Sequence, residues 1–578
     1  MADKVYDVVI VGAGNKSIIT AMYLAKYANL SVGVFEERHE ACDGWASEEA
    51  MGGGLDNDPC SNMMAHYPMY FGPVWEDFPE LRDYGMRFVP HPVGPTLVLK
   101  DGKALCIHSE EFDPDQKKTA ESISKFSKKD AETWLRLWAL WKSKWQQAWH
   151  ENFFNPPDPF HPEKDAFFRL FLNPKENGVD PYWARRSPFQ LTRELFESPE
   201  LLVLFCRVAD TGGYTMAEAG LGFPNLLAML FWTGGSACVR GGTHTLAHAC
   251  VRAVTKNGGE IFYKRYVKKI LIENNKAKGI VLHDGTQIEA RVAVVTGVDV
   301  FQLVFELVGP QHFEPEDVRR VQILEADYNA LYWFFTAFTE HPVLYAEDYD
   351  PDVKWSGYIS MLQKPPSREM LLEYDGYRRL GIRIPKDVIQ PVYTDHSLID
   401  TTRTSSGMAA VLTELFNVNY ANTPTDRNFM KVYDEIVREY HEIFMGFHKN
   451  ITREKIYGHS IEGPKALAAI SRSFYHGNWN AIDFLADQFA PTRPTPNLAA
   501  GRMPVKGLYA TGMCFQQGGW AGAWNGYSLY KVMAEDLDLP KPWEDKGRAP
   551  ETVDVCYKYL DRFRVIPKDV PGYPQPKI

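Results

Sequence analysis

The segment Asp7–Glu37, DVVIVGAGNKSIITAMYLAKYANLSVGVFEE, decides the fold that we expect for this chain. Val8–Val11 is a short apolar, β-branched run of the kind that forms a buried parallel strand. A glycine turn at Gly12–Gly14 follows directly, a helical pattern begins near Ser17, and a second apolar strand ends at Glu36. Strand, glycine turn, helix, strand and acid in this order predict a dinucleotide-binding unit rather than an ordinary β-α-β turn.

The residues of this unit each have a physical reason to be there. Gly12 allows the tight turn, and Gly14 lets the backbone approach a diphosphate at the positive end of the helix. The Glu36 carboxylate is placed to accept hydrogen bonds from a ribose diol. Ser17 replaces the third glycine of a GxGxxG pattern, so we expect a modest distortion where the helix packs on the strand. The residues expected to bind the cofactor here are Gly12, Gly14, Asn15, Ser17, Glu36 and Glu37.

A second segment, Val505–Tyr527, VKGLYATGMCFQQGGWAGAWNGY, is typical of another part of the same site. Gly507–Gly512 is a short buried strand that ends in glycine, and a glycine turn and a helix follow it. Backbone N–H groups at such a helix start can stabilise negative charge on a reduced flavin, although the segment also fits a purely structural β-α turn. If both segments form one site, the chain leaves its nucleotide-binding domain and returns to complete it.

Composition and charge exclude several classes of protein. The 578 residues are 45% hydrophobic and 24% charged, enough for two or three subdomains with substantial cores. A net charge of −11 argues against nucleic acid as the main partner. The chain has no apolar run of the ~20 residues that span a bilayer, and its first strand begins close to Met1. We therefore expect a cytoplasmic protein, with peripheral membrane contact left open.

The cysteines and histidines show no metal-binding pattern. None of the eight cysteines forms a CxxC pair, and none of the sixteen histidines belongs to an HExxH motif. We expect reduced thiols and no metal site.

The segment from 120 to 150 is expected to be helical and carries five tryptophans at spacings of four, three, four and four. This spacing puts them on one helix face. They form either a packed core face, or an aromatic wall for an apolar ligand or a membrane-facing surface. The five are Trp134, Trp138, Trp141, Trp145 and Trp149.

The chain resembles the phytoene desaturase-related family of FAD-dependent oxidoreductases, within the amine oxidase superfamily. The resemblance rests on GAGNKSI and FEE at the start, on Ser47-Glu48-Glu49, on GGTHTLAHAC in the central part, and on GLYATG and Trp524–Tyr527 near the end. The chain departs from the family at residues 42–44, CDG, where the family has a Gly-Gly turn that touches the diphosphate. The resemblance implies that Gly44 lies near the diphosphate, that Val267 lies against the adenine, and that the final turn and helix contribute Gly512, Gly519 and Asn525.

The resemblance also implies a domain order. We expect an α/β fold, a Rossmann-like FAD-binding domain of the glutathione-reductase and amine-oxidase type with an inserted α+β substrate domain. The FAD-binding domain is expected at 1–70, 236–300 and 486–540. The substrate domain is expected at 71–235 and 301–485, and 541–578 is expected to be a C-terminal extension.

The expected chemistry needs little acid–base machinery from the protein. A flavin dehydrogenase must hold an activated C–H bond near flavin N5 and exclude water. We expect desaturation or dehydrogenation of a hydrophobic organic molecule by hydride transfer to N5. The electron acceptor is then a quinone, oxygen or another molecule, because no second GxGxxG unit is present for NAD(P)H. The residues expected to reach the reacting carbon are Gln516, Gln517, Trp520 and Trp524.

Two other functions fit the same pattern. One is a redox-neutral isomerase or hydratase that uses FAD without net oxidation. The other is a non-catalytic prenyl- or lipid-binding protein on the same fold, against which Glu36 and the intact Gly12–Gly14 turn argue.

Overall fold

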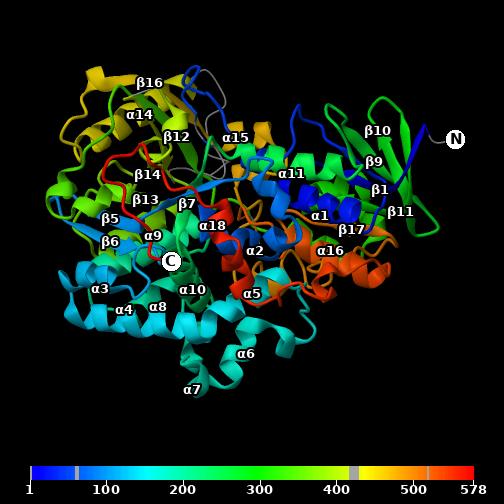
Figure 1. The fold of residues 1–578 in the computed structure, drawn as a ribbon, viewed down its shortest axis with the longest axis horizontal. Helices are drawn as coiled ribbons and strands as arrows, with labels where there is room; N and C mark the ends of the chain where they lie inside the picture. The colour runs from blue at the N-terminus through cyan, green and yellow to red at the C-terminus, as the bar shows by residue number, and fades with distance from the viewer. Residues whose placement is uncertain are drawn as a thin grey trace.

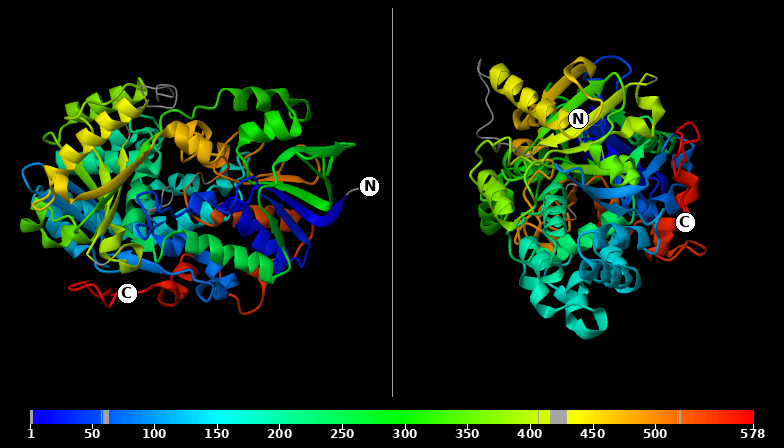
Figure 2. Two further views of the ribbon diagram at one scale, coloured as in Figure 1. Left: turned by 90° about the horizontal axis from the view of Figure 1, so that it is seen from above. Right: turned by 90° about the vertical axis from the view of Figure 1, so that its left-hand side faces the viewer.

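Two large β-sheets lie side by side along the long axis of the molecule, with helices packed around them (Figure 1). The computed structural model describes residues 3–56, 58, 64–405, 407–415, 429–516, 518 and 520–578. The N-terminus lies at the outer end of the first sheet, whereas the C-terminus lies beside the second (Figure 2).

The first sheet takes its strands from three distant parts of the chain. Five parallel strands stand in the order β8 (Glu260–Phe262), β2 (Val32–Phe35), β1 (Lys4–Val11), β11 (Gln287–Thr296) and β17 (Leu508–Ala510). The antiparallel strands β10 (Lys276–Leu282) and β9 (Val267–Glu273) extend the sheet from β11. The chain therefore returns to its first sheet near its end, and the Rossmann-like α/β fold is confirmed. The domain boundaries stay a prediction.

A glycine in the loop after β11 compensates for Ser17, which replaces the third glycine of the GxGxxG pattern. Helix α1 (Asn15–Lys26) begins directly after Gly14, and the Ser17 hydroxyl donates to the carbonyls of Gly12, at 2.6 Å, and Gly14, at 2.9 Å. Residue 297, just after β11, is glycine, and a Cβ built there would lie 2.7 Å from Ser17 Oγ. The serine fits because its neighbour has no side chain.

Replacing Gly297 with alanine will therefore destabilise the protein. The Ser17 side chain or the backbone must move to admit the methyl group, and overpacking of this kind lowers the free energy of unfolding by ~1–3 kcal/mol. Ser17→Gly removes the contact with the serine side chain and should restore part of the stability. The rescue stays incomplete because the Gly12 carbonyl still lies 3.2 Å from the new Cβ. Urea denaturation of the two single variants and the double variant measures the coupling. Equal effects of Gly297→Ala in both backgrounds would contradict this packing.

The second sheet is mostly antiparallel and has seven strands. Its order is β16 (Ile456–Glu462), β12 (Tyr332–Phe338), β15 (Ala409–Leu415), β14 (Val392–Thr394), β13 (Ser356–Leu362), β5 (Val93–Leu99) and β6 (Ala104–His108). Helix α14 (Phe429–Met445) covers one end through the stacked rings of Phe338 and Phe444. Helices α9 (Pro199–Gly212) and α10 (Gly222–Thr233) pack near β5. A small third sheet has the order β3 (Met64–Ala65), β7 (Ser236–Val239) and β4 (Phe88–His91).

The tryptophan-rich segment is not one helix, as the sequence predicts, but a short helix followed by a long one that runs without a break from 128 to 154 and carries all five tryptophans. The short helix is α3 (Lys117–Ser124), and the long one comprises α4 (Lys128–Leu140), a π-helical turn at Trp141–Trp145 and α5 (Gln146–Phe154). The Ser127 hydroxyl accepts from the Asp130 amide and so starts a new helix within the range predicted as one. All five tryptophans are at most 5% exposed, so they form a packed core face and not a membrane-facing surface.

The C-terminal extension is packed against the rest of the protein. Helices α17 (Asp554–Lys558) and α18 (Leu560–Phe563) precede a stretch without regular structure. The Phe563 ring stacks on Trp75 with centroids 4.3 Å apart, and the Tyr573 hydroxyl donates to the Pro90 carbonyl. In the described part of the chain, no helix is both long and apolar enough to cross a bilayer.

Candidate active site

A cleft opens at the carboxyl ends of the parallel strands of the first sheet. Its walls come from the turn before α1, the end of β2, the start of β9, the loop after β11, a loop from the second-sheet side at 471–474, and the residues after β17. Ligands of open α/β sheets bind at this edge. Eight predicted cofactor residues line the cleft: Gly12, Gly14, Asn15, Glu36, Glu37, Gly44, Val267 and Gly512.

The other predicted cofactor residues lie elsewhere. Ser17 lies behind the turn, against Gly297. The Asn525 side chain, in the first turn of α16 (Trp524–Asp536), donates to the Gln516 carbonyl at 2.6 Å. Both residues border a separate small cavity behind that helix. Gly519 lies outside the described residues, as does Gln517, one of the predicted catalytic residues.

Glu36 is held in place by the backbone at the end of β2. One carboxylate oxygen accepts from the Ala13 amide at 2.6 Å, and the other accepts from the Arg38 amide at 2.8 Å. Burial raises the pKa of Glu36 to about 7, and the nearby Asp43 carboxylate adds to the effect. The side chain therefore titrates near neutral pH in a cleft where a ribose diol is expected.

Lys16 is a cleft residue that is absent from the sequence-based predictions. It lies in the first turn of α1, is 2% exposed and donates to the Trp520 carbonyl. Burial lowers the pKa of Lys16 to about 7, while the Asp43 carboxylate acts in the opposite direction. Its position two residues after Gly14 indicates a role in the cleft, because a lysine there places a cation beside the helix N-terminus. Arg472 and Asp299 also line the cleft; Arg472 comes from the second-sheet side and has no local signal.

A buried arginine fixes the loop that forms the far wall of the cleft. Arg493 is fully buried, and its guanidinium donates to five backbone carbonyls. They belong to Asn480, Ile482, Asp483, Gln488 and Met513. Because Ala481 and Met513 line the cleft, Arg493 sets the position of a wall that it does not itself form.

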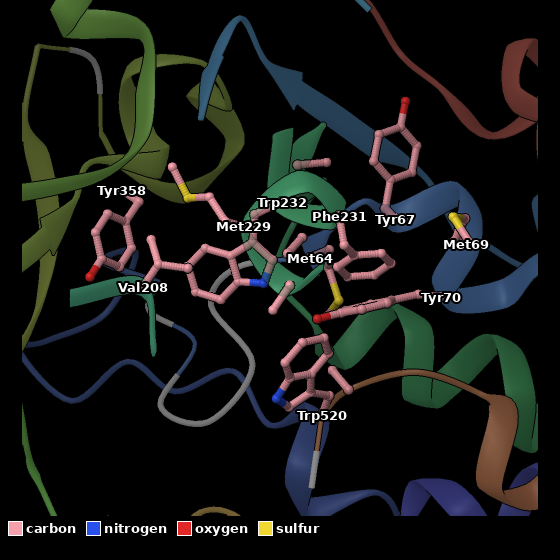
Figure 3. Close-up of a cluster of buried hydrophobic side chains, with 14 of the residues drawn as sticks. Met64, Tyr67, Met69, Tyr70, Val208, Met229, Phe231, Trp232, Tyr358 and Trp520 are labelled. Carbon is pink, nitrogen blue, oxygen red and sulfur yellow. The ribbon is translucent and has the colours of Figure 1, made fainter. Parts of the chain in front are cut away.

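Trp520 and Trp524, both predicted to reach the reacting carbon, lie in a buried aromatic cluster. The Trp520 indole donates to the Gly212 carbonyl at 2.9 Å, and its ring stacks on Phe231 with centroids 5.6 Å apart. Trp149 lies 5.8 Å from the same ring, so one residue of the tryptophan face reaches this cluster. Trp524 meets the Tyr70 ring edge to face. Figure 3 shows the side chains of Trp520, Tyr70 and Phe231 close together, with Met229 and Trp232 continuing toward Tyr358.

Trp520 links the cleft to the aromatic cluster. The Trp520 ring faces the aromatic cluster, while its carbonyl accepts from Lys16, which lines the cleft. Within the described residues, Trp520 thus contacts the polar cleft through its backbone and the buried aromatic cluster through its side chain.

Known proteins share this architecture. A scan against models of protein families finds no match. The chain is 25% identical to a subunit of limonene dehydrogenase from Castellaniella defragrans, with 94% of this chain and 97% of that protein covered. It is 25% identical to hydroxyneurosporene desaturase of Cereibacter sphaeroides, with 60% of this chain and 68% of that protein covered.

Solved structures agree in fold. An oxidoreductase from Methanosarcina mazei superposes with a TM-score of 0.55 at 15% identity, and 91% of this chain and 99% of that chain are covered. A putrescine oxidase variant gives a TM-score of 0.55 at 11% identity, with 93% and 99% covered. The fold and the relatives together confirm the resemblance seen in the sequence. The chain is similar over most of its length to a limonene dehydrogenase subunit, and it shares the fold of putrescine oxidase.

Proposed function

We propose that the cleft holds FAD and that the chain removes a hydride from a hydrophobic organic molecule lying in the aromatic cluster. The observation that carries this proposal is the junction at Trp520, where a nucleotide-type cleft meets a buried aromatic region. Neither part alone would indicate a flavin dehydrogenase.

The residues of the cleft fit the polar half of FAD. The first N–H groups of α1 have no partner within the helix, so those beside Gly14 and Asn15 are suited to a diphosphate. A Cβ on Gly12 would lie 3.4 Å from the Val298 side chain, and its φ of +83° favours glycine. Glu36 is suited to the ribose diol, and the Lys16 ammonium adds positive charge for the diphosphate.

The protein's contribution to the reaction is to orient the substrate and to exclude water. Bound FAD would supply a hydride acceptor at N5. The stacked, buried rings of Trp520 and Phe231 would contact an apolar molecule through their faces and edges without hydrogen bonds. Trp520 is a positioning candidate in this scheme, whereas the Gln516 side chain borders the separate cavity behind α16.

The substrate class that we propose is an unsaturated hydrocarbon. The two relatives are named for limonene and for hydroxyneurosporene. An aromatic cluster suits such molecules, because their long or cyclic hydrocarbon parts gain contact area with the rings. The electrons then pass to a quinone, to oxygen or to another acceptor.

The visible absorption spectrum, followed anaerobically while unsaturated hydrocarbons are added, tests this function. Oxidised-flavin bands that bleach with one substrate would support a dehydrogenase and identify its substrate class. Trp520→Ala should slow this bleaching by roughly 10- to 100-fold through lost contact area, with FAD content unchanged. Trp134→Phe, a buried core change outside the cluster, should leave the rate unchanged.

Two outcomes would overturn the proposal. Product that forms only after prior reduction of the flavin, without net bleaching, would indicate a redox-neutral isomerase or hydratase. A colourless protein that takes up no FAD would indicate a binding protein on a flavoprotein scaffold. Readmitting oxygen or a soluble quinone to the bleached enzyme then identifies the electron acceptor.

A further inference from the structure

Three metal-ligating side chains meet away from the cleft. His91 ends β4, Cys238 lies in β7, and His396 begins a 3₁₀ turn at His396–Leu398. The register of β4 and β7 pairs His91 with Ser236 and Val89 with Cys238, so His91 and Cys238 project from the same face as diagonal neighbours. One nitrogen or sulfur atom from each of the three lies within 4.8 Å of the other two.

The geometry of this cluster is close to that of a metal site. His91 Nε2 and His396 Nδ1 are 3.1 Å apart. Zinc bonds of ~2.0–2.3 Å in a tetrahedron put neighbouring donor atoms roughly 3.3–3.8 Å apart, so only a small adjustment is needed. The three side chains are at most 5% exposed, and two imidazoles with one thiolate are a donor set that suits Zn²⁺.

The buried charges around the cluster favour a divalent cation. Arg403 pairs with Asp58 at 2.8 Å and with Asp400 at 3.2 Å, and all three are buried. These three groups, which interact electrostatically with Cys238, carry a sum of −1. This net negative charge beside the cluster favours a bound cation, because uncompensated charge inside a protein is costly.

A buried hydroxyl beside the cluster is a candidate for a fourth ligand. A Cβ on Gly357 of β13 would lie 2.7 Å from the His91 ring and 2.8 Å from Ser236 Oγ, so glycine lets β13 approach the cluster closely. Within the described ranges the buried Ser236 hydroxyl has no hydrogen-bond partner. Its oxygen lies beside His91 on the same face of the small sheet.

We propose that His91, Cys238 and His396 hold one structural Zn²⁺ ion, with Ser236 or a water molecule as the fourth ligand. The ion would cross-link β4, β7 and the turn at His396–Leu398, which are separated by more than a hundred residues in sequence. This spacing explains why the sequence predicts no metal: none of the three ligands lies in a local motif.

Elemental analysis of the purified protein tests the proposal. We expect about one zinc per chain in the wild type. After removal of zinc with a chelator, Co²⁺ should bind and give d–d bands at longer wavelengths than the flavin absorption. Cys238→Ser and His396→Gln should lose most of the metal. Cys250→Ser, a change at an equally buried cysteine outside the cluster, should retain it.

The wild type alone suffices to overturn the proposal, even if a ligand variant fails to fold. Protein that contains no zinc as isolated and takes up no Co²⁺ would show that His91 and His396 share only a hydrogen bond. Metal that stays bound in Cys238→Ser and His396→Gln would place it elsewhere.

Discussion

Replacing Arg493 with alanine will lower the free energy of unfolding by on the order of 4–5 kcal/mol, a large effect for a single substitution. Its guanidinium donates to five buried carbonyls, and each acceptor left without a partner costs about 1–3 kcal/mol. Burial lowers the pKa of Arg493 to about 10, so the side chain stays charged at neutral pH. Arg493→Lys should recover little, because an ammonium cannot reach carbonyls spread around a planar fork.

Urea denaturation measures the loss, and Arg502→Ala is the matched control. Arg502 pairs with Glu535 and Asp536, but its side chain is 42% exposed. Exposed ion pairs contribute only ~0–1 kcal/mol, so this variant should unfold near the wild-type midpoint. Because Ala481 and Met513 line the cleft, Arg493→Ala should also weaken FAD binding in whatever folded protein remains. Equal midpoints for the two variants would contradict the role of Arg493.

The polar half of the site was predictable because its residues lie in local sequence patterns. A glycine turn between a strand and a helix, and an acid at the end of the next strand, act through backbone geometry that the sequence displays directly. Glu36, Gly14 and Gly512 therefore line the cleft as expected. The return of β17 to the first sheet was also visible as a short apolar strand ending in glycine.

The remaining features depend on contacts between distant segments. Arg472 enters the cleft from the second-sheet side, and Arg493 acts on carbonyls of two separate loops. The sequence also places the start of the tryptophan-bearing helix too early, because the cap at Ser127 depends on one side-chain hydrogen bond to the Asp130 amide. Position 297 is a further example, because it must be glycine only on account of its contact with Ser17, which is far away in sequence.

Replacing Glu36 with alanine will weaken FAD binding by roughly 10- to 150-fold. Charge-assisted hydrogen bonds from the ribose diol to a carboxylate contribute about 1.5–3 kcal/mol. Glu36→Gln keeps an acceptor but removes the charge, so its loss should be smaller. Titration of apoprotein with FAD, followed by flavin fluorescence, measures these affinities. Glu260→Ala, in the edge strand β8 and outside the residues that line the cleft, should bind FAD like the wild type, because Glu260 pairs with Lys4 and the Tyr6 hydroxyl.

The pH dependence of FAD binding separates the charge of Glu36 from its shape. The raised pKa of about 7 means that the empty site holds an ionised carboxylate above neutral pH and a carboxylic acid below it. The ribose diol favours the ionised form, so the Glu36 contribution is greatest above pH ~7 and declines as pH falls through it. Lys16 acts in the opposite direction, since its pKa is also about 7 and its ammonium attracts the diphosphate at lower pH.

The ratio of wild-type affinity to that of Glu36→Gln, measured across pH, therefore isolates the carboxylate. This ratio should be largest in alkaline solution and approach one in acid, because protonated Glu36 and glutamine both offer one neutral acceptor. Lys16→Met should leave the trend in this ratio intact while lowering FAD affinity most in acid. A ratio that does not change with pH would place the ribose away from Glu36, and the cofactor would then have to lie differently in the cleft.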